Sequence, residues 1–302
     1  MRSLPLRLLV VLPLLGLTVA CGGRPGTVSG AVDGFGTPVD PTQPNTTSAP
    51  PAPMPKNPER AKPRPAPKTA PGGLLRKAAA SVEPGTTLGA VVYDRTTGKY
   101  TVAYNADRGF RSASLVKLLI AIDLLERGAG SADRQRIARM LTMSDDGLAS
   151  MFWVRAGGPA LVTRTSAELG LTGVRPPEVA GQWGEVVVTP RDIVTIYRYV
   201  LGLPPADRDL IVDSLGQAPR VAADGFDQYF GIPDGLDAQW AVKQGWGNND
   251  RTMVLHTTGL VGPGFRYVVV LLTEHPLGSG WQTCAQSVTA AAGALRAGLP
   301  GI

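Results

Sequence analysis

The sequence contains very few of the residues that build metal sites and disulfides. Among 302 residues there are two histidines, His256 and His275, and two cysteines, Cys21 and Cys284. A zinc site built on histidine has almost no ligands to draw on, so we expect neither a metal ion nor another cofactor. If Cys21 is lipidated, Cys284 has no cysteine partner, and the folded part contains no disulfide. We therefore predict that Cys284 is a small buried hydrophobic side chain.

An excess of charge of one sign is also missing from the part that we expect to fold. The formal net charge is +6, but eight basic residues and only three acidic ones lie in residues 1–72. Residues 73–302 hold 22 basic and 21 acidic side chains. Nucleic-acid binding needs a concentrated basic surface, so this balance argues against a nucleic-acid partner.

The N-terminus has the pattern of an export signal. Arg2 and Arg7 precede an apolar run, residues 8–20, that ends in Ala20 directly before Cys21. A charged start, an apolar core and a small residue before the cut are typical of a signal peptide, which we assign to residues 1–20. The cysteine after the small residue resembles a lipoprotein signal, in which Cys21 is lipidated and anchors the protein to the extracytoplasmic face of the cell membrane. The alternative is an ordinary secretory signal with an incidental cysteine.

The next segment has the composition of a spacer. Residues 21–72 are dominated by Pro, Gly, Ala, Thr and Ser, and prolines recur every two or three residues from Ala49 to Pro71. Such a segment buries too little apolar surface to offset the entropy of ordering it, so we predict a disordered, stiff spacer. The folded domain is then residues 73–302.

One helix start organises the expected fold. The sequence Ser114-Leu115-Val116-Lys117 runs into an almost wholly apolar stretch, residues 118–125, before Gly128. A run of this length predicts a helix buried in a protein core, and it is too short to cross a bilayer. Ser114 and Lys117 are three residues apart and therefore share one face of that helix. A hydroxyl beside an amine at this position predicts a nucleophile and the base that takes its proton.

The remaining pattern predicts an α+β fold. The expected strands are residues 88–94, 100–104, 240–243, 252–258 and 265–272. The expected helices beyond the first are residues 131–141, 148–154, 159–169, 191–201, 207–215 and 283–297. Thr189-Pro190 supplies a cap and a first helical residue for the helix over 191–201. Strands at both ends of the domain imply an antiparallel sheet flanked by helices, with an all-helical subdomain at about residues 129–220.

Two further motifs join Ser114-Leu115-Val116-Lys117. Ser144-Asp145-Asp146 stands in a break between helices, and Lys243-Gln244-Gly245 follows the start of a strand. In this order and spacing the three resemble Ser-x-x-Lys, Ser-Asp-Asn and Lys-Thr-Gly of the serine β-lactamase and penicillin-binding protein superfamily, and of class A β-lactamases in particular. The resemblance covers roughly residues 75–302. The chain as a whole is most similar to the β-lactamase-like lipoproteins of actinobacteria.

The resemblance implies a role for each matching residue. Ser114 would be the acylated nucleophile, and Lys117 would take its proton. Ser144 would bridge toward Lys243 and relay a proton to the leaving group. The backbone N–H groups of Ser114 and Trp246 would form the oxyanion hole.

The resemblance also implies a set of substrate-binding residues, and here the sequence departs from the family. Lys243 and Gln244 would bind the carboxylate end of the substrate, and Gly245 would let the substrate lie close to the strand. Asp146 stands where the family has an asparagine, and an ionised aspartate has no hydrogen bond to donate. Its charge also favours the protonated form of Lys117, which weakens that lysine as a base.

No match to the deacylating glutamate of class A β-lactamases is found before Thr189-Pro190. The loop offers Glu178 and Glu185, both of which are more simply explained as surface carboxylates. His256 lies on an expected strand and is more simply explained as a structural histidine than as a base for Ser114.

Two functions remain open. The first is a lipid-anchored serine hydrolase that acts through an acyl-enzyme at Ser114 on a peptide or amide, such as a peptidoglycan stem peptide or a β-lactam, and that is weak as a lactamase. The second is a catalytically impaired domain that binds cell-wall fragments or a partner protein in the same cleft. The intact Ser114, Lys117, Ser144 and Lys243 favour the first, and the departures favour the second.

Overall fold

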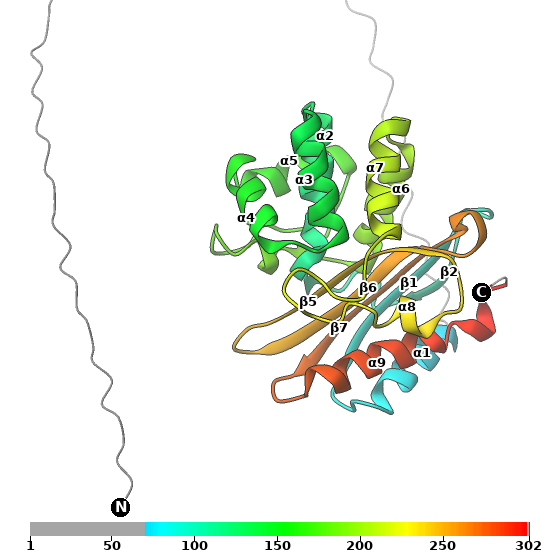
Figure 1. Cartoon of the computed structure of the whole chain (residues 1–302). Helices are drawn as coiled ribbons and strands as arrows, with labels where there is room; N and C mark the ends of the chain where they lie inside the picture. The colour runs from blue at the N-terminus through cyan, green and yellow to red at the C-terminus, as the bar shows by residue number, and fades with distance from the viewer. Residues whose placement is uncertain (1–69, 301) are drawn as a thin grey trace, which may run out of the picture. The chain divides into compact units, whose positions relative to one another are not determined.

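The computed structural model describes residues 70–300 and 302. The predicted signal peptide, the lipidation site Cys21 and the spacer up to residue 69 lie outside the described residues. The described chain is α+β: a five-stranded antiparallel sheet carries helices on both faces (Figure 1). The predicted fold class is confirmed.

The sheet joins strands from the two ends of the domain. Its order is β2-β1-β7-β6-β5, and every neighbouring pair is antiparallel. The bounds are β1 (Thr87–Asp94), β2 (Lys99–Tyr104), β5 (Trp240–Asn248), β6 (Thr252–Val261) and β7 (Tyr267–Pro276). Because β1 pairs with β7, the first hairpin and the last three strands form one continuous sheet. The strand β5 lies at the edge, where it is free to meet another part of the chain.

The central strand β7 is buried on both faces. Alternate side chains of a strand point to opposite faces, and Val268, Val270 and Leu272 belong to the core under the helices α2–α7. Val269 and Leu271 belong to a second core, under α1 and α9. Two apolar faces explain why this strand is an unbroken apolar run in the sequence. Figure 1 shows these two helical layers on opposite sides of the sheet.

The helix that carries Lys117 lies inside the helical layer. All residues of α2 from Val116 to Leu125 are buried, as the apolar run predicts. The predicted cap at Thr189 is also present, since its hydroxyl accepts a hydrogen bond from the backbone N–H of Asp192. The helices of this layer are α2 (Val116–Glu126), α3 (Ser131–Thr142), α4 (Asp146–Arg155), α5 (Pro159–Leu169), α6 (Pro190–Gly202) and α7 (Pro205–Gly216). Within residues 70–300 and 302, no helix is long and apolar enough to span a membrane.

Five further helices and strands complete the described fold. The helix α1 (Ala70–Ala80) begins inside the predicted spacer, because Leu75 and Ala79 pack on the sheet although Pro and Gly precede them. The other helices outside the main layer are α8 (Ile232–Gly235) and α9 (Trp281–Gly293). The strands β3 (Phe110–Arg111) and β4 (Val187–Val188) form a separate two-stranded sheet. Two-residue strands exist only through their tertiary pairing, which no local pattern can indicate.

We predict that the stability of the domain depends on the burial of α2. Replacing Leu119, which is fully buried, by alanine leaves a cavity and should lower the free energy of unfolding by about 2–5 kcal/mol. Leu74 is 60% exposed, so the same change there should cost less than about 0.5 kcal/mol. Urea denaturation followed by circular dichroism measures both values. Equal losses in the two variants would contradict the assignment of α2 as the central helix of the core.

Candidate active site

The nucleophile candidate lies at the junction of β3 and α2. A single turn of 3₁₀ helix, Ala113–Leu115, joins the two elements, and Ala113 adopts a left-handed backbone conformation with φ of 43°. Only 5% of Ser114 is exposed. Lys117 follows one turn later, and its Nζ lies 2.9 Å from Ser114 Oγ. The two side chains therefore share one helix face, as their spacing predicts.

The turn between α3 and α4 brings a second hydroxyl to the lysine. Ser144 has a φ of 53°, which is unusual for a residue other than glycine, and Asp145 caps α4 by accepting from the N–H of Leu148. Ser144 Oγ lies 3.2 Å from Lys117 Nζ and 3.0 Å from Lys243 Nζ. This hydroxyl therefore bridges the two lysines. Strained backbone on both sides of the cluster is typical of a functional site.

The surroundings of Lys117 fix the direction of its hydrogen bonds. Its Nζ lies 2.6 Å from the carbonyl oxygen of Ser144 and 2.5 Å from Asp146 Oδ1. A carbonyl and a carboxylate can only accept, so they take two N–H groups of the lysine. A neutral amine then has its lone pair left for the hydroxyl of Ser114. The geometry thus suits a base, provided that the amine is neutral.

Burial favours the neutral form of both lysines. It lowers the pKa of Lys117, while the carboxylates of Asp146, Asp224 and Asp145 raise it and offset part of the effect. Burial likewise holds the pKa of Lys243 well below its usual range, and the nearby charge of Lys117 lowers it further. Two ammonium groups that share one hydroxyl oppose each other's protonation.

The edge strand β5 closes the site from the opposite side. Lys243 Nζ reaches Ser144 Oγ and also lies 2.9 Å from the carbonyl oxygen of Gln244. A Cβ atom on Gly245 would lie 3.0 Å from the carbonyl oxygen of Ser112 and 3.4 Å from the backbone nitrogen of Ser114. The absence of a side chain therefore lets β5 approach the start of α2. The next residue, Trp246, lies beside this contact.

The predicted substrate-binding residues do not all face the two lysines. The side chain of Asp146 is 59% exposed and contacts Lys117. Gln244 is buried, and its amide nitrogen donates to the carbonyl oxygens of Gln228 and Phe230, so it is directed away from the lysines. The amide oxygen of Gln244 is buried without a hydrogen-bond partner. The structure thus brings Asp146 and Gly245 to the cluster but does not bring the amide of Gln244 there.

Two tryptophans cover the lysines. The ring of Trp183 lies 5.1 Å from Lys117 Nζ, and its indole nitrogen donates to Ser150 Oγ over 3.1 Å. The ring of Trp246 lies 6.0 Å from Lys243 Nζ, and its indole nitrogen donates to Asp224 Oδ2 over 2.9 Å. No sequence motif indicated Asp224. In the sequence, Asp224 stands directly before Gly225 and belongs to none of the three motifs.

The other candidate bases are engaged elsewhere. Glu185 accepts from Arg111 over 2.7 Å, and Glu178 is an exposed loop residue. His256 is fully buried, and burial lowers its pKa to about 4. Its Nδ1 accepts from the N–H of Thr273, so its Nε2 donates to the carbonyl oxygen of Arg111. These positions agree with the structural interpretation of all three residues. Within residues 70–300 and 302, no three histidine, cysteine or acidic side chains are grouped so as to hold a metal ion.

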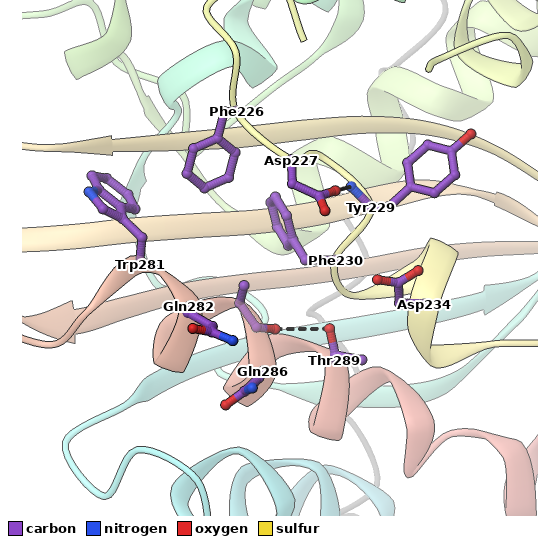
Figure 2. Close-up of a pocket in the computed structure, with 10 residues that line it drawn as sticks. Phe226, Asp227, Tyr229, Phe230, Asp234, Trp281, Gln282, Gln286 and Thr289 are labelled. Carbon is purple, nitrogen blue, oxygen red and sulfur yellow. Dashed lines mark hydrogen bonds between the residues drawn. The ribbon is translucent and has the colours of Figure 1, made fainter. Parts of the chain in front are cut away.

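Two open pockets lie beside the cluster without reaching Ser114. One, of about 550 Å³, lies between residues 226–234 and α9, and its wall includes Phe226, Phe230 and Trp281 (Figure 2). The other, of about 940 Å³, lies between the loop that carries Trp183 and the turn between β5 and β6. Phe226 stacks on Trp246 with ring centroids 4.8 Å apart, so the first pocket shares a wall with the cover of Lys243.

Comparison with known sequences identifies relatives of this chain. The profile of the β-lactamase enzyme family matches residues 75–136, which include Ser114 and Lys117. The "Putative lipoprotein LppW" of Mycobacterium tuberculosis and that of Mycobacterium bovis are each 37% identical over 204 residues. The match covers 64% of this chain and 64% of LppW, so the chain spans less than two thirds of the length of these relatives.

Solved structures establish the fold. The β-lactamase from Streptomyces albus G is 24% identical with a TM-score of 0.57, over 72% of this chain and 98% of that one. PBP-A is 20% identical with a TM-score of 0.58, over 74% and 94%. The class A β-lactamase of the last common ancestor of Gram-negative bacteria is 19% identical with a TM-score of 0.60, over 76% and 99%. The chain therefore has the fold of class A β-lactamases and penicillin-binding proteins, as its three motifs predict, and its sequence is similar to that of the mycobacterial "Putative lipoprotein LppW".

Proposed function

We propose that the protein is an exported serine hydrolase that forms an acyl-enzyme at Ser114 with a peptide or amide substrate. The observation that carries this proposal is the 2.9 Å separation of Lys117 Nζ and Ser114 Oγ, in a lysine whose two shortest contacts are to obligate acceptors. A peptidoglycan stem peptide and a β-lactam are the substrate classes that the resemblance implies. A variant of PBP-A has been solved as an acyl-enzyme complex with penicillin G, which is in keeping with such chemistry on this fold.

The proposed acylation follows from the hydrogen bonds of the cluster. Ser114 Oγ attacks the substrate carbonyl while its proton passes to Lys117 Nζ. The negative charge on the carbonyl oxygen is stabilised by the backbone N–H groups of Ser114 and Trp246, which the approach of Gly245 keeps close together. When the tetrahedral intermediate collapses, the leaving group takes a proton from Ser144 Oγ. Lys117, which holds the proton of Ser114, passes it to this oxygen, and Lys243 contacts the same oxygen.

Hydrolysis of the acyl-enzyme is expected to be slow. It requires a base that activates water on the other side of the ester, and neither loop carboxylate is placed for this role. Glu185 is paired with Arg111, and Glu178 is exposed. A long-lived acyl-enzyme would make the protein weak as a lactamase.

The first prediction concerns covalent labelling of Ser114. The wild-type protein should be labelled by a fluorescent penicillin or by a fluorophosphonate probe, and the adduct should persist because deacylation is slow. Ser114→Ala should abolish the label. Ser214 is equally buried, at 5% exposed, and its hydroxyl bonds only within α7, so Ser214→Ala is the matched control and should label normally. Labelling that survives in Ser114→Ala, or none with either probe, would contradict the proposal.

The second prediction concerns the pH dependence of acylation. Only neutral Lys117 can accept the proton of Ser114, so acylation should fall as pH drops through the pKa of Lys117. Asp146 raises that pKa, so Asp146→Asn should lower it and move the acid limb of the rate profile to lower pH. At a fixed pH on this limb, the variant should be acylated several-fold faster than the wild type.

The control for this prediction is Asp209→Asn, because Asp209 is similarly exposed, at 54%, and pairs with Arg208. The charges that face Lys117 besides Asp146 are Asp145, Asp224 and Lys243, and these remain in both variants. The measurement is the rate of probe labelling across pH. An acid limb that stays in place or moves to higher pH in Asp146→Asn would refute the role of Lys117 as the base.

We also propose that Cys21 carries the lipid and holds the domain at the extracytoplasmic face of the cell membrane. The support is the signal pattern of residues 1–21 and the relation to LppW, whose name describes a lipoprotein. Replacing Cys21 by alanine in the full chain should move the protein from the membrane pellet to the soluble fraction, whereas Cys284→Ala should not. Equal membrane association of wild type and Cys21→Ala would exclude this anchor.

The near burial of Ser114 and the position of Trp183 favour a second candidate function, which is binding without catalysis. Because Ser114 is nearly buried and Trp183 lies over Lys117, the cleft could bind a wall fragment or a partner protein without acylation. In that case the wild type would form no adduct with either probe. Its affinity for wall fragments would be the same in Ser114→Ala and Lys117→Ala.

A further inference from the structure

The site carries a second carboxylate that no motif indicates. Asp224 lies in the loop before β5, and its Oδ2 accepts the indole N–H of Trp246. The ring of Trp246 stacks on Phe226, and its centroid lies 6.0 Å from Lys243 Nζ. Through Trp246, Asp224 borders the cluster beside Lys243, and its charge, like that of Asp146, acts on both lysines.

The charges of the cluster do not balance once Lys117 acts as a base. Proton transfer from Ser114 requires neutral Lys117, which leaves Lys243 as the only remaining cation against the carboxylates of Asp146 and Asp224. Burial favours the neutral form of Lys243 as well, since it lowers the pKa of this lysine. The state that can be acylated is thus negatively charged overall, and it repels an anionic group that approaches Lys243.

The groups that could compensate for this charge are already engaged. Both N–H groups of the Gln244 amide have carbonyl partners, so this side chain offers no donor to a ligand. Lys243 Nζ contacts Ser144 Oγ and the carbonyl oxygen of Gln244. Arg220, on the segment before Asp224, pairs with Asp227 and Asp234. A substrate carboxylate would find a carboxylate beside it and no free cation from these residues.

We propose that the substrate ends in an uncharged amide, not in a free carboxylate, on the leaving-group side of the scissile bond. This inference rests on the proposed function, because the leaving-group side is defined by Ser144 and Lys243, which supply its proton. Asp224 is the specificity-determining residue, and it disfavours a carboxylate next to Trp246. A penicillin carries a carboxylate on its leaving-group side, so it should acylate Ser114 more slowly than an uncharged probe. An amide has N–H groups that can donate to Asp224 where a carboxylate has none.

A matched pair of thioesters tests the proposal. Hippuryl thioglycolate and hippuryl thioglycolamide differ only in the carboxylate or carboxamide of the leaving thiol. The loss of thioester absorbance gives kcat/KM for each with the full-length protein, and Ser114→Ala gives the blank. The wild type should prefer the thioglycolamide by about tenfold, and added salt should narrow the ratio because Asp224 is exposed.

Two isosteric variants assign the preference to one residue. Asp224→Asn removes the charge beside Trp246 and should bring the ratio of the two rates close to one, by accelerating the thioglycolate reaction. Asp234→Asn removes a charge that pairs with Arg220 and should leave the ratio as in the wild type. A wild-type preference for the thioglycolate, or an unchanged ratio in Asp224→Asn, would overturn the proposal.

A binding measurement separates this inference from the proposed chemistry. In Ser114→Ala, calorimetry with hippurylglycinamide and hippurylglycine reports recognition without acylation. Tighter binding of hippurylglycinamide than of hippurylglycine, with the difference lost in Asp224→Asn, would support the inference. If neither thioester reacted with the wild type, that separate result would refute the proposed hydrolase and leave this inference standing. Equal binding of the two peptides, tighter binding of hippurylglycine, or binding of neither would overturn the inference.

Discussion

The arrangement of the site depends on the burial of one amine. Lys117 lies in a helix whose neighbouring residues are all buried, so its side chain cannot reach solvent and must find polar partners inside the protein. A buried cation without partners is too costly to keep, and here the turn between α3 and α4 supplies a carbonyl, a hydroxyl and a carboxylate. The left-handed backbone of Ser144 is what directs its carbonyl oxygen and its hydroxyl at the same amine. The fold of this turn and the charge of this lysine are therefore coupled.

The second lysine favours the neutral form of this buried amine, which its proposed role as a base requires. Lys117 and Lys243 meet at Ser144 Oγ, burial lowers the pKa of both, and the charge of Lys117 lowers that of Lys243 further. Asp146 and Asp224 act in the opposite direction on both lysines. In the proposed mechanism, the reactivity of Ser114 is set by the balance between the desolvation of two amines and the proximity of two carboxylates. In this chain the carboxylates are the exposed members, so solvent and salt weaken their effect more than they weaken burial.

Local patterns in the sequence were sufficient for the elements that carry their own signals. The apolar run after Lys117 predicted α2, Thr189-Pro190 predicted the start of α6, and the three motifs predicted which residues meet at Ser144. The orientation of Gln244 could not be predicted, because it depends on carbonyl groups of residues 228 and 230 that reach β5 only in the folded chain. Asp224 was missed for the same reason: its link to Trp246 joins two segments with no shared motif. The helix α1 was hidden by the prolines and glycines around it, although Leu75 packs in the core.

The chemistry and the recognition of substrate are held by different parts of this fold. The hydrogen-bonded chain of Ser114, Lys117, Ser144 and Lys243 is fixed by helix starts and by the close approach of β5, so moving any member disturbs the core.

The two tryptophans that cover the lysines are held less firmly than this chain. The indole of Trp183 makes one hydrogen bond, to Ser150, and a bond of this kind contributes only about 0.5–1.5 kcal/mol net. The ring of Trp183 also packs against the apolar core, so a ligand that displaces it must replace this packing as well as its contact with Lys117. With such a ligand, the near-complete burial of Ser114 is compatible with acylation. Displacing Trp246 is harder, because its stacking on Phe226 and its bond to Asp224 would both be lost. Substrates should therefore enter past Trp183, and the rim formed by Trp246 and Asp224 should act as a fixed boundary.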